Sequence, residues 1–119
     1  MDRKPTSFFK SCECAYKGIV YSFKTERHLR FHFFTALLVI VLGFFFNLKV
    51  QEWLFIIYAI GSVIAAELFN TALERVVDLT KPGYHHLAAL AKDIAAGAVL
   101  VTTVQAVIIG TIIFGPYIF

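Results

Sequence analysis

Three long apolar stretches constrain the fold of this chain more than any other feature. The first and third stretches hold no formally charged residue, and the second holds a single one, Glu67. A helix that crosses a bilayer needs about 20 mainly apolar residues, and each stretch is close to that length or longer. The sequence therefore predicts an all-α integral membrane protein whose transmembrane helices span residues 31–48, 53–73 and 94–116.

Composition indicates the same class of protein. Hydrophobic residues make up 59% of the chain and charged residues 16%, whereas soluble domains average roughly 45–50% and about 25%. This balance excludes a soluble multi-domain enzyme and a disordered adaptor. The two cysteines, Cys12 and Cys14, lie two positions apart and cannot form a disulfide framework. We expect residues 1–119 to form one membrane domain without a cleaved signal peptide, because the charged first 30 residues contain no apolar run.

The distribution of basic residues predicts the orientation in the membrane. Residues 1–30 contain seven Lys and Arg residues, residues 74–93 contain three, and the loop between the first two spans contains Lys49 alone. Loops rich in Lys and Arg remain on the cytoplasmic side. We therefore expect a multi-pass protein of the plasma (inner) membrane whose N-terminus is cytoplasmic.

The segment before the first span has the pattern of an amphipathic helix. From residue 7 to residue 27 there is no proline, and apolar side chains recur at steps of three and four residues: Phe8, Cys12, Ala15, Ile19 and Phe23. Lysines recur at steps of seven on another face: Lys10, Lys17 and Lys24. This pattern predicts a surface helix in the headgroup layer within residues 1–30, and the alternative is a disordered basic tail.

A polar stripe crosses the end of the second span. Glu67, Asn70, Glu74 and Asp78 follow at spacings of three, four and four, which places them on one side of a helix. An ionisable group at membrane depth costs on the order of 3 kcal/mol or more, so Glu67 is a functional candidate. Asn70 is also compatible with a contact between helices, and Glu74 and Asp78 with solvated acids beyond the membrane.

Two further charged clusters are expected at the same membrane surface. Glu26 precedes the first span, and Lys92 and Asp93 precede the third. Paired carboxylates suit a hard cation such as Mg²⁺, a lysine suits a phosphate, and a buried glutamate suits a general base. Together they indicate phosphoryl transfer at an interface, although the sequence contains neither a P-loop nor a Gly-rich kinase loop. The residues by themselves predict an acidic, metal-capable site at a membrane surface.

One segment of the chain has the motif of a known family. Residues 67–100 read ELFNTALERVVDLTKPGYHHLAALAKDIAAGAVL. They resemble the signature of the prokaryotic diacylglycerol kinase and undecaprenol kinase family, E-x-x-N-[ST]-A-[IL]-E-x-[VL]-V-D followed by A-K-D and A-V-L. Lys17-Gly18, residues 23–27, Arg30 and His32 resemble the family's first conserved block. The resemblance implies a homotrimer of three-span subunits, each with an amphipathic surface helix, whose active sites are shared between subunits.

The resemblance also implies roles for individual residues. Glu67 is expected to be the catalytic base that takes the proton of the lipid hydroxyl, and therefore also to contact the lipid substrate. Glu26 and Glu74 are expected to hold Mg²⁺. The residues expected to bind ATP are Cys14, Glu26, Asn70, Glu74, Asp78, Gly83, Tyr84, His85, Lys92 and Asp93.

Two positions depart from the family pattern. His28 stands where close relatives tend to carry Asn, and Cys14 stands where the diacylglycerol kinase branch carries an ATP-contacting Tyr. His28 and His32, four residues apart, suit either a zinc pair or interfacial hydrogen bonds. Hydrogen bonds are the favoured interpretation because the sequence offers no third ligand for zinc.

The expected function is that of an ATP- and Mg²⁺-dependent lipid kinase. Residues 23–27 resemble the undecaprenol kinase branch, which favours undecaprenol as substrate and undecaprenyl phosphate as product. The alternatives are a diacylglycerol kinase that makes phosphatidic acid, a non-catalytic membrane assembly subunit, and an ion or proton conduit. The expected partners are a lipid alcohol, ATP, the bilayer and further copies of the chain, and no nucleic acid.

Overall fold

The computed structural model describes residues 7–119, and within that range the chain is helical apart from short connections. Its helices are α1 (Phe8–Thr25), α2 (Arg27–Phe45), α3 (Val50–Thr80) and α4 (His86–Ile118). By length and composition, α2, α3 and α4 can each cross a membrane, so the structure contains three candidate membrane-spanning helices, the number that the sequence predicts. Residues 1–6 of the predicted surface segment lie outside the described residues.

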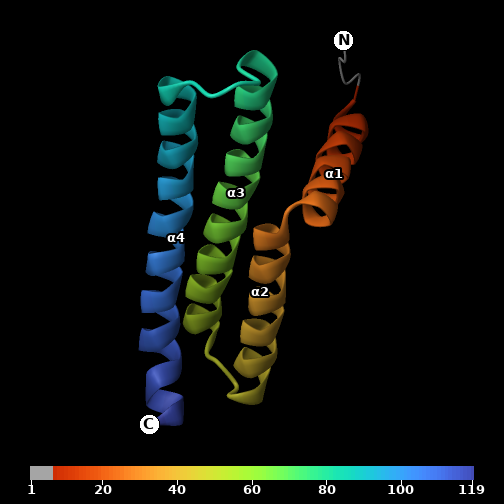
Figure 1. Ribbon diagram of the computed structural model, residues 1–119. Coiled ribbons are helices and arrows are strands. Elements are labelled where there is room, and N and C mark those ends of the chain that lie inside the picture. Colours follow the sequence, from red (N-terminus) through yellow and green to blue (C-terminus); the bar gives the residue numbers. More distant parts are fainter. Residues whose placement is uncertain (1–6) are drawn as a thin grey trace.

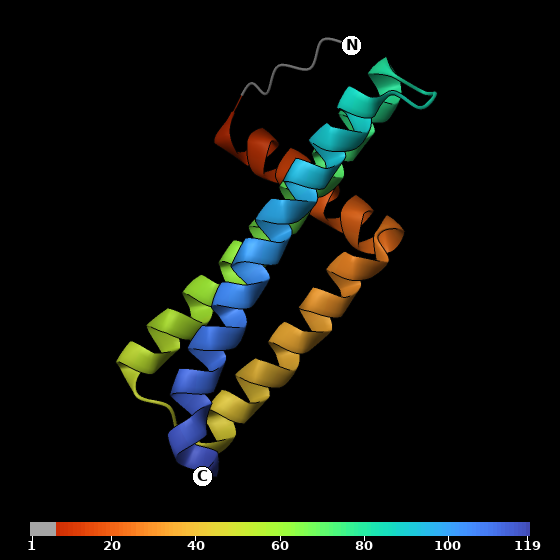
Figure 2. The same ribbon diagram turned by 60° about the vertical axis from the view of Figure 1, so that its left-hand side comes forward.

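The three long helices form an open bundle. α3 lies between α2 and α4, and α1 lies toward the end where α3 and α4 are connected (Figure 1). α1 contacts α2 and α3. Figure 2 shows that α1 runs across the direction of α3 and α4. α3 packs against α4 and also against α2, whereas α2 and α4 make no close backbone approach within residues 7–119. This arrangement leaves an open groove along α3, between α2 and α4.

The helix predicted in residues 7–27 is present as α1. It begins after Ser7, whose side-chain oxygen accepts the backbone N–H of Lys10 at 3.2 Å, as expected for an N-cap. Large apolar side chains on α1 are exposed, among them Phe8, Phe9 and Tyr16. Its predicted place in the headgroup layer stays a prediction.

The corner between α1 and α2 is fixed by an arginine. Glu26 separates the two helices in an extended conformation, with φ −110° and ψ 112°. The Nη1 group of Arg30 donates to the carbonyl oxygens of Phe23 at 2.9 Å and Lys24 at 3.0 Å. These carbonyls belong to the last turn of α1, where helix carbonyls lack intrahelical partners. Arg30 therefore stabilises the bend that places Glu26 beside α3.

An apolar cluster is buried at the end of the bundle opposite α1. It consists of Leu48, Ile56, Ile113 and Phe114. Asn47 adopts φ 55°, a left-handed conformation that asparagine tolerates and that closes the turn after α2. A Cβ atom at Gly43 would lie 2.5 Å from Cη2 of Trp53, so only glycine fits there without a shift of the indole ring.

Glu52 joins α3 to the end of α4 in the same region. Its Oε1 atom accepts the hydroxyl of Tyr117 at 2.6 Å and the backbone N–H of Lys49 at 2.8 Å. The first contact joins α3 to α4 through two residues 65 positions apart in the chain, and the second caps the start of α3.

The helices extend beyond the predicted spans at the end near α1. α3 continues past residue 73 to Thr80, and α4 begins at His86, before residue 94. Many polar residues have good helix propensity, so a helix can continue beyond the apolar stretch that crosses the hydrocarbon layer. Residues 81–85, which include Pro82 and Gly83, connect α3 to α4.

Candidate functional site

Glu67 is a buried carboxylate in α3. Only 4% of the residue is exposed, and its Oε2 atom lies 3.3 Å from Nε2 of His32 on α2. Within residues 7–119, no other His, Lys or Arg nitrogen lies within 4.0 Å of this carboxylate. A buried polar group is costly without a polar partner, and His32 provides one for Glu67.

Both residues line a cavity of about 370 Å³ between α2, α3 and α4. The polar side chains in its wall are His28 and His32 from α2, Glu67 and Asn70 from α3, and Thr103 from α4. The rest of the wall is apolar, contributed by Phe31, Ala96, Val99 and Leu100. The Oδ1 atom of Asn70 is buried without a hydrogen-bond partner among the described residues. The cavity therefore places the carboxylate of Glu67 and the unpaired Oδ1 atom of Asn70 in a mostly apolar wall.

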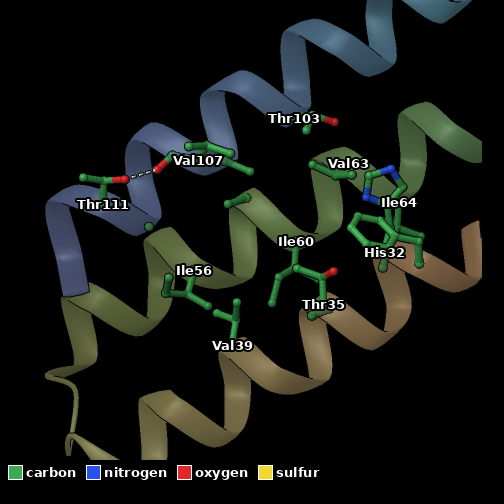
Figure 3. A pocket seen from close by; sticks show the side chains of 15 residues that line it. His32, Thr35, Val39, Ile56, Ile60, Val63, Ile64, Thr103, Val107 and Thr111 are labelled. Atoms are coloured by element: carbon green, nitrogen blue, oxygen red, sulfur yellow. Dashed lines mark hydrogen bonds between the residues drawn. The ribbon is translucent and has the colours of Figure 1, made fainter. Parts of the chain in front are cut away.

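A second cavity of about 470 Å³ extends from this site along the bundle. The two cavities share Phe31, His32 and Thr103. Figure 3 shows His32 at one end, with Ile56 and Thr111 toward the other. Most side chains along the walls are apolar, with Val39 from α2, Ile60 from α3 and Val107 from α4 as examples. We call this second cavity the apolar groove.

Glu26 is held against α3 by Arg75. The Nη2 atom of Arg75 lies 2.7 Å from Oε2 of Glu26, and Nε donates to the hydroxyl of Tyr21 at 3.0 Å. Nη2 also lies 3.4 Å from the hydroxyl of Thr25, and the guanidinium carbon lies 5.5 Å from the centre of the Tyr21 ring. One arginine of α3 thus contacts both the end of α1 and the acid that follows it.

The two predicted metal residues, Glu26 and Glu74, are both partly exposed carboxylates. Within residues 7–119, no group of three or more His, Cys, Asp and Glu side chains is placed to hold a metal ion. Glu74 is adjacent in sequence to Arg75, the residue that holds Glu26. Mg²⁺ is commonly bound by one or two carboxylates together with substrate phosphates, so this donor set fits such an ion. The role of Glu26 and Glu74 in metal binding stays a prediction.

Part of the predicted nucleotide site is brought together at the connection between α3 and α4. Nζ of Lys92 donates to Oδ1 of Asp78 at 2.7 Å, which links α4 to α3. A third cavity, of about 220 Å³, is lined by Asp78, Lys92 and three further predicted residues, Gly83, Tyr84 and His85. Nδ1 of His85 accepts the backbone N–H of Leu87 at 3.1 Å and so caps α4.

The remaining predicted residues do not meet in one place. Asn70 lines the cavity of Glu67, whereas Cys14, Glu74 and Asp93 line none of the three cavities. Sequence reasoning assigned no role to Arg75 and did not identify His32 as the neighbour of Glu67. The available signals were that Arg75 is the one basic residue within the acidic stripe and that His32 is an ionisable residue in an apolar stretch.

Comparisons with known proteins agree with the sequence motif. The family model described as Prokaryotic diacylglycerol kinase matches residues 13–114. The chain is 46% identical to the undecaprenol kinase of Bacillus subtilis (strain 168), over 92% of this chain and 89% of that protein. It is 43% identical to a diacylglycerol kinase of Synechocystis sp., over 86% of this chain and 59% of the relative. It is also 29% identical to the diacylglycerol kinase of Escherichia coli (strain K12), over 87% and 84% of the two chains.

Proposed function

This chain belongs to the prokaryotic diacylglycerol kinase family, and from that premise we propose that it transfers the γ-phosphate of ATP to the hydroxyl of a membrane lipid alcohol. Its relatives are named as kinases, and its three long apolar helices are those of a multi-pass membrane protein. The observation that carries the proposal is the buried carboxylate of Glu67, which lines a cavity that adjoins the apolar groove.

The proposed substrate is undecaprenol, and the proposed product is undecaprenyl phosphate. This choice is supported by the 46% identity to a protein named undecaprenol kinase across most of both chains. The apolar groove offers hydrocarbon contacts to any long lipid tail, so it does not favour one lipid over another. Diacylglycerol, with phosphatidic acid as product, is the second candidate because a relative at 43% identity is named diacylglycerol kinase.

The proposed reaction uses Glu67 as the general base. The lipid enters with its tail in the apolar groove and its hydroxyl in the cavity of Glu67. The carboxylate accepts the hydroxyl proton, the hydroxyl oxygen forms a bond to the γ-phosphorus, and the bond from that phosphorus to the β,γ-bridging oxygen breaks. ADP leaves with that oxygen. A positioned base of this kind typically contributes about 10²–10⁴ in rate.

The nucleotide is proposed to lie near Lys92 and the connection between α3 and α4. The Lys92 ammonium already lies 2.7 Å from Asp78, so its side chain extends toward α3. Phosphate oxygens can take the place of that carboxylate, because both are strong anionic acceptors. Asp78, Gly83, Tyr84 and His85 line the cavity beside it and are proposed to contact the nucleotide. We propose contacts from Cys14, Asn70 and Asp93 on the strength of the family motif.

A divalent cation is proposed to accompany ATP. Mg²⁺ would be held by Glu26 and Glu74, whose carboxylate oxygens are the ligand type that it prefers. When bound, it would neutralise negative charge on the phosphates. The contribution of this chain is to hold Glu26 in place, and the contact between Arg75 and Glu26 supports that role.

The proposed assembly is a homotrimer with active sites shared between subunits and with a cytoplasmic N-terminus. Shared sites are supported by the open groove between α2 and α4 and by the separation of the predicted ATP residues in one chain. The orientation is supported by the basic residues of the N-terminal segment and of the loop after α3. α1 is proposed to lie on the membrane surface, with Phe8, Phe9 and Tyr16 toward the lipid.

The proposal is tested with the purified chain in mixed micelles, labelled ATP and Mg²⁺. Undecaprenol and diacylglycerol are offered separately and then together at equal mole fraction. We expect label in both lipids when each is alone and preferential labelling of undecaprenol in competition. Preference for diacylglycerol would favour the second candidate. If neither lipid is labelled, the chain is not a kinase for these lipids, and the result favours a non-catalytic subunit.

A further inference from the structure

His32 has no role in the proposed mechanism, although it contacts the proposed general base. It lies in α2 with only 15% of its side chain exposed, and Glu67 beside it has 6% of its side chain exposed. It also lines both the cavity of Glu67 and the apolar groove, so it stands where the two meet. Figure 3 shows its ring beside Ile64 and Val63 of α3, at the end of the groove.

The two side chains are in direct polar contact. Nε2 of His32 and Oε2 of Glu67 are 3.3 Å apart, and two facing lone pairs at that distance in an apolar wall would repel each other. The imidazole ring can carry a proton on Nε2 in its neutral form, with Nδ1 as an acceptor. In that form the ring can donate to Oε2, and Oε1 then remains available to another donor.

The surroundings offer no competing charged donor to this carboxylate. α4 contributes Ala96, Val99, Leu100 and Thr103 to the cavity, none of which titrates near neutral pH. His28, one turn before His32, is the other titratable side chain in the wall besides the pair itself. Among the described residues, His28 has no nitrogen within 4.0 Å of Glu67. Among the described residues, His32 is thus the one basic side chain within 4.0 Å of the carboxylate.

We propose that His32 is a positioning residue for Glu67. By donating its Nε2–H to Oε2, it holds the carboxylate so that Oε1 faces the lipid hydroxyl at the mouth of the apolar groove. This inference rests on the proposed function and adds a residue to it. In the transfer, the hydroxyl proton moves to Oε1 and the hydroxyl oxygen bonds to the γ-phosphorus, while His32 keeps its own proton throughout.

Two substitutions separate positioning from packing. His32→Leu keeps an apolar side chain of moderate size and removes the donor, whereas His32→Gln replaces Nε2–H with an amide N–H. Ser62→Ala is the control, because Ser62 is a polar residue of the same bundle whose hydroxyl donates to the carbonyl of Tyr58, one turn earlier. All three are compared with the unchanged chain in mixed micelles at saturating and limiting ATP and lipid.

We expect His32→Leu to lower kcat by roughly 100-fold with the KM for ATP unchanged, because a misplaced catalytic group costs about that much. His32→Gln is expected to recover kcat to within about tenfold of the unchanged chain, and Ser62→Ala to match it. If His32→Leu keeps its kcat, or if the two His32 variants lose activity equally, the proposal is wrong.

A spectroscopic measurement tests the pair without turnover. In ¹⁵N-histidine NMR spectra, we expect Glu67→Gln to shift the ring nitrogens of His32 and Ser62→Ala to leave them unchanged. Unshifted His32 signals in Glu67→Gln would overturn the pairing. If the unchanged chain phosphorylates no lipid while this shift is observed, the proposed function fails and the pair stands. If the chain is active and His32→Leu is normal, only the role of His32 fails.

Discussion

Nη2 of Arg75 lies 2.7 Å from Oε2 of Glu26, which ties α3 to the single residue that separates α1 from α2. The same guanidinium contacts the hydroxyls of Tyr21 and Thr25 at the end of α1. Arg75 therefore holds Glu26 close to α3, the helix that carries the polar stripe. A residue outside the predicted site thus positions one of its predicted metal ligands.

Arg75→Met is expected to reduce activity more than stability. Methionine keeps much of the side-chain length but loses the charge and the hydrogen bonds, so Glu26 is no longer held. Partly exposed ion pairs contribute about 0–1 kcal/mol to stability, so the helices should remain folded. We expect kcat to fall by about tenfold to 100-fold and the Mg²⁺ requirement to rise. Arg27→Met, which removes an equal charge one residue after Glu26, is the control and should keep its activity; equal loss in both variants would contradict the role of Arg75.

Glu26→Ala and Glu74→Ala are expected to be strongly non-additive. Either change alone removes one of two carboxylates proposed to act on the same ion, so each should raise the Mg²⁺ requirement or abolish activity. The double variant should be little worse than the more damaging single variant in a Mg²⁺ titration of initial rates. Glu13→Ala, an exposed acid of α1, should leave the titration unchanged. Effects that simply multiply would argue against a shared ion.

Lys92→Ala is expected to weaken ATP binding. Charge-assisted hydrogen bonds contribute about 1.5–3 kcal/mol, which corresponds to a KM for ATP raised by roughly tenfold to 100-fold. The KM for the lipid should change little, because Lys92 lies beside the α3–α4 connection and not in the apolar groove. Lys10→Ala, on α1, is the control in the same steady-state assay. A rise confined to the lipid KM would place Lys92 elsewhere.

Tyr117→Phe is expected to affect stability and leave catalysis intact. The change removes the hydroxyl that donates to Glu52 at 2.6 Å at the end of the bundle far from Glu67. Loss of such a bond typically costs about 0.5–1.5 kcal/mol. Denaturant unfolding in micelles should show this loss for Tyr117→Phe and none for Tyr58→Phe, whose residue is exposed on α3. Equal stability of the two variants would show that the contact contributes nothing.

The helices were predictable because their signals are local. Apolar length indicates three spans, and the spacing from Glu67 to Asp78 indicates one face of one helix. The partner of Glu67 was not predictable in this way, since it depends on which side of α2 packs against α3 and at what height. The same holds for Arg75 and Glu26, which are 49 positions apart and meet only because of the corner at Glu26. Residue spacing within a helix shows which side chains share a face of that helix. Which residues of another helix they contact depends on how the two helices pack.

The predicted ATP residues also differ in how far the sequence alone relates them to one another. Asp78 and Lys92 are joined because α3 and α4 are antiparallel neighbours connected by a short loop, and the loop residues 83–85 come with them. Cys14 lies on α1, and only the family motif relates it to that cavity. Its assignment therefore remains a prediction from resemblance.

The central claim is that Glu67 takes the proton of the lipid hydroxyl, and Glu67→Gln tests it most directly. Glutamine keeps the shape and can still contact His32, but it cannot accept the proton. The measurement is kcat for lipid phosphorylation at saturating ATP, lipid and Mg²⁺, with Glu52→Gln on the same helix as the matched control. We predict a loss of about 10²–10⁴ in kcat for Glu67→Gln, with helix content and oligomeric state unchanged, and a near-normal kcat for Glu52→Gln. A Glu67→Gln variant that keeps half its turnover would contradict the account.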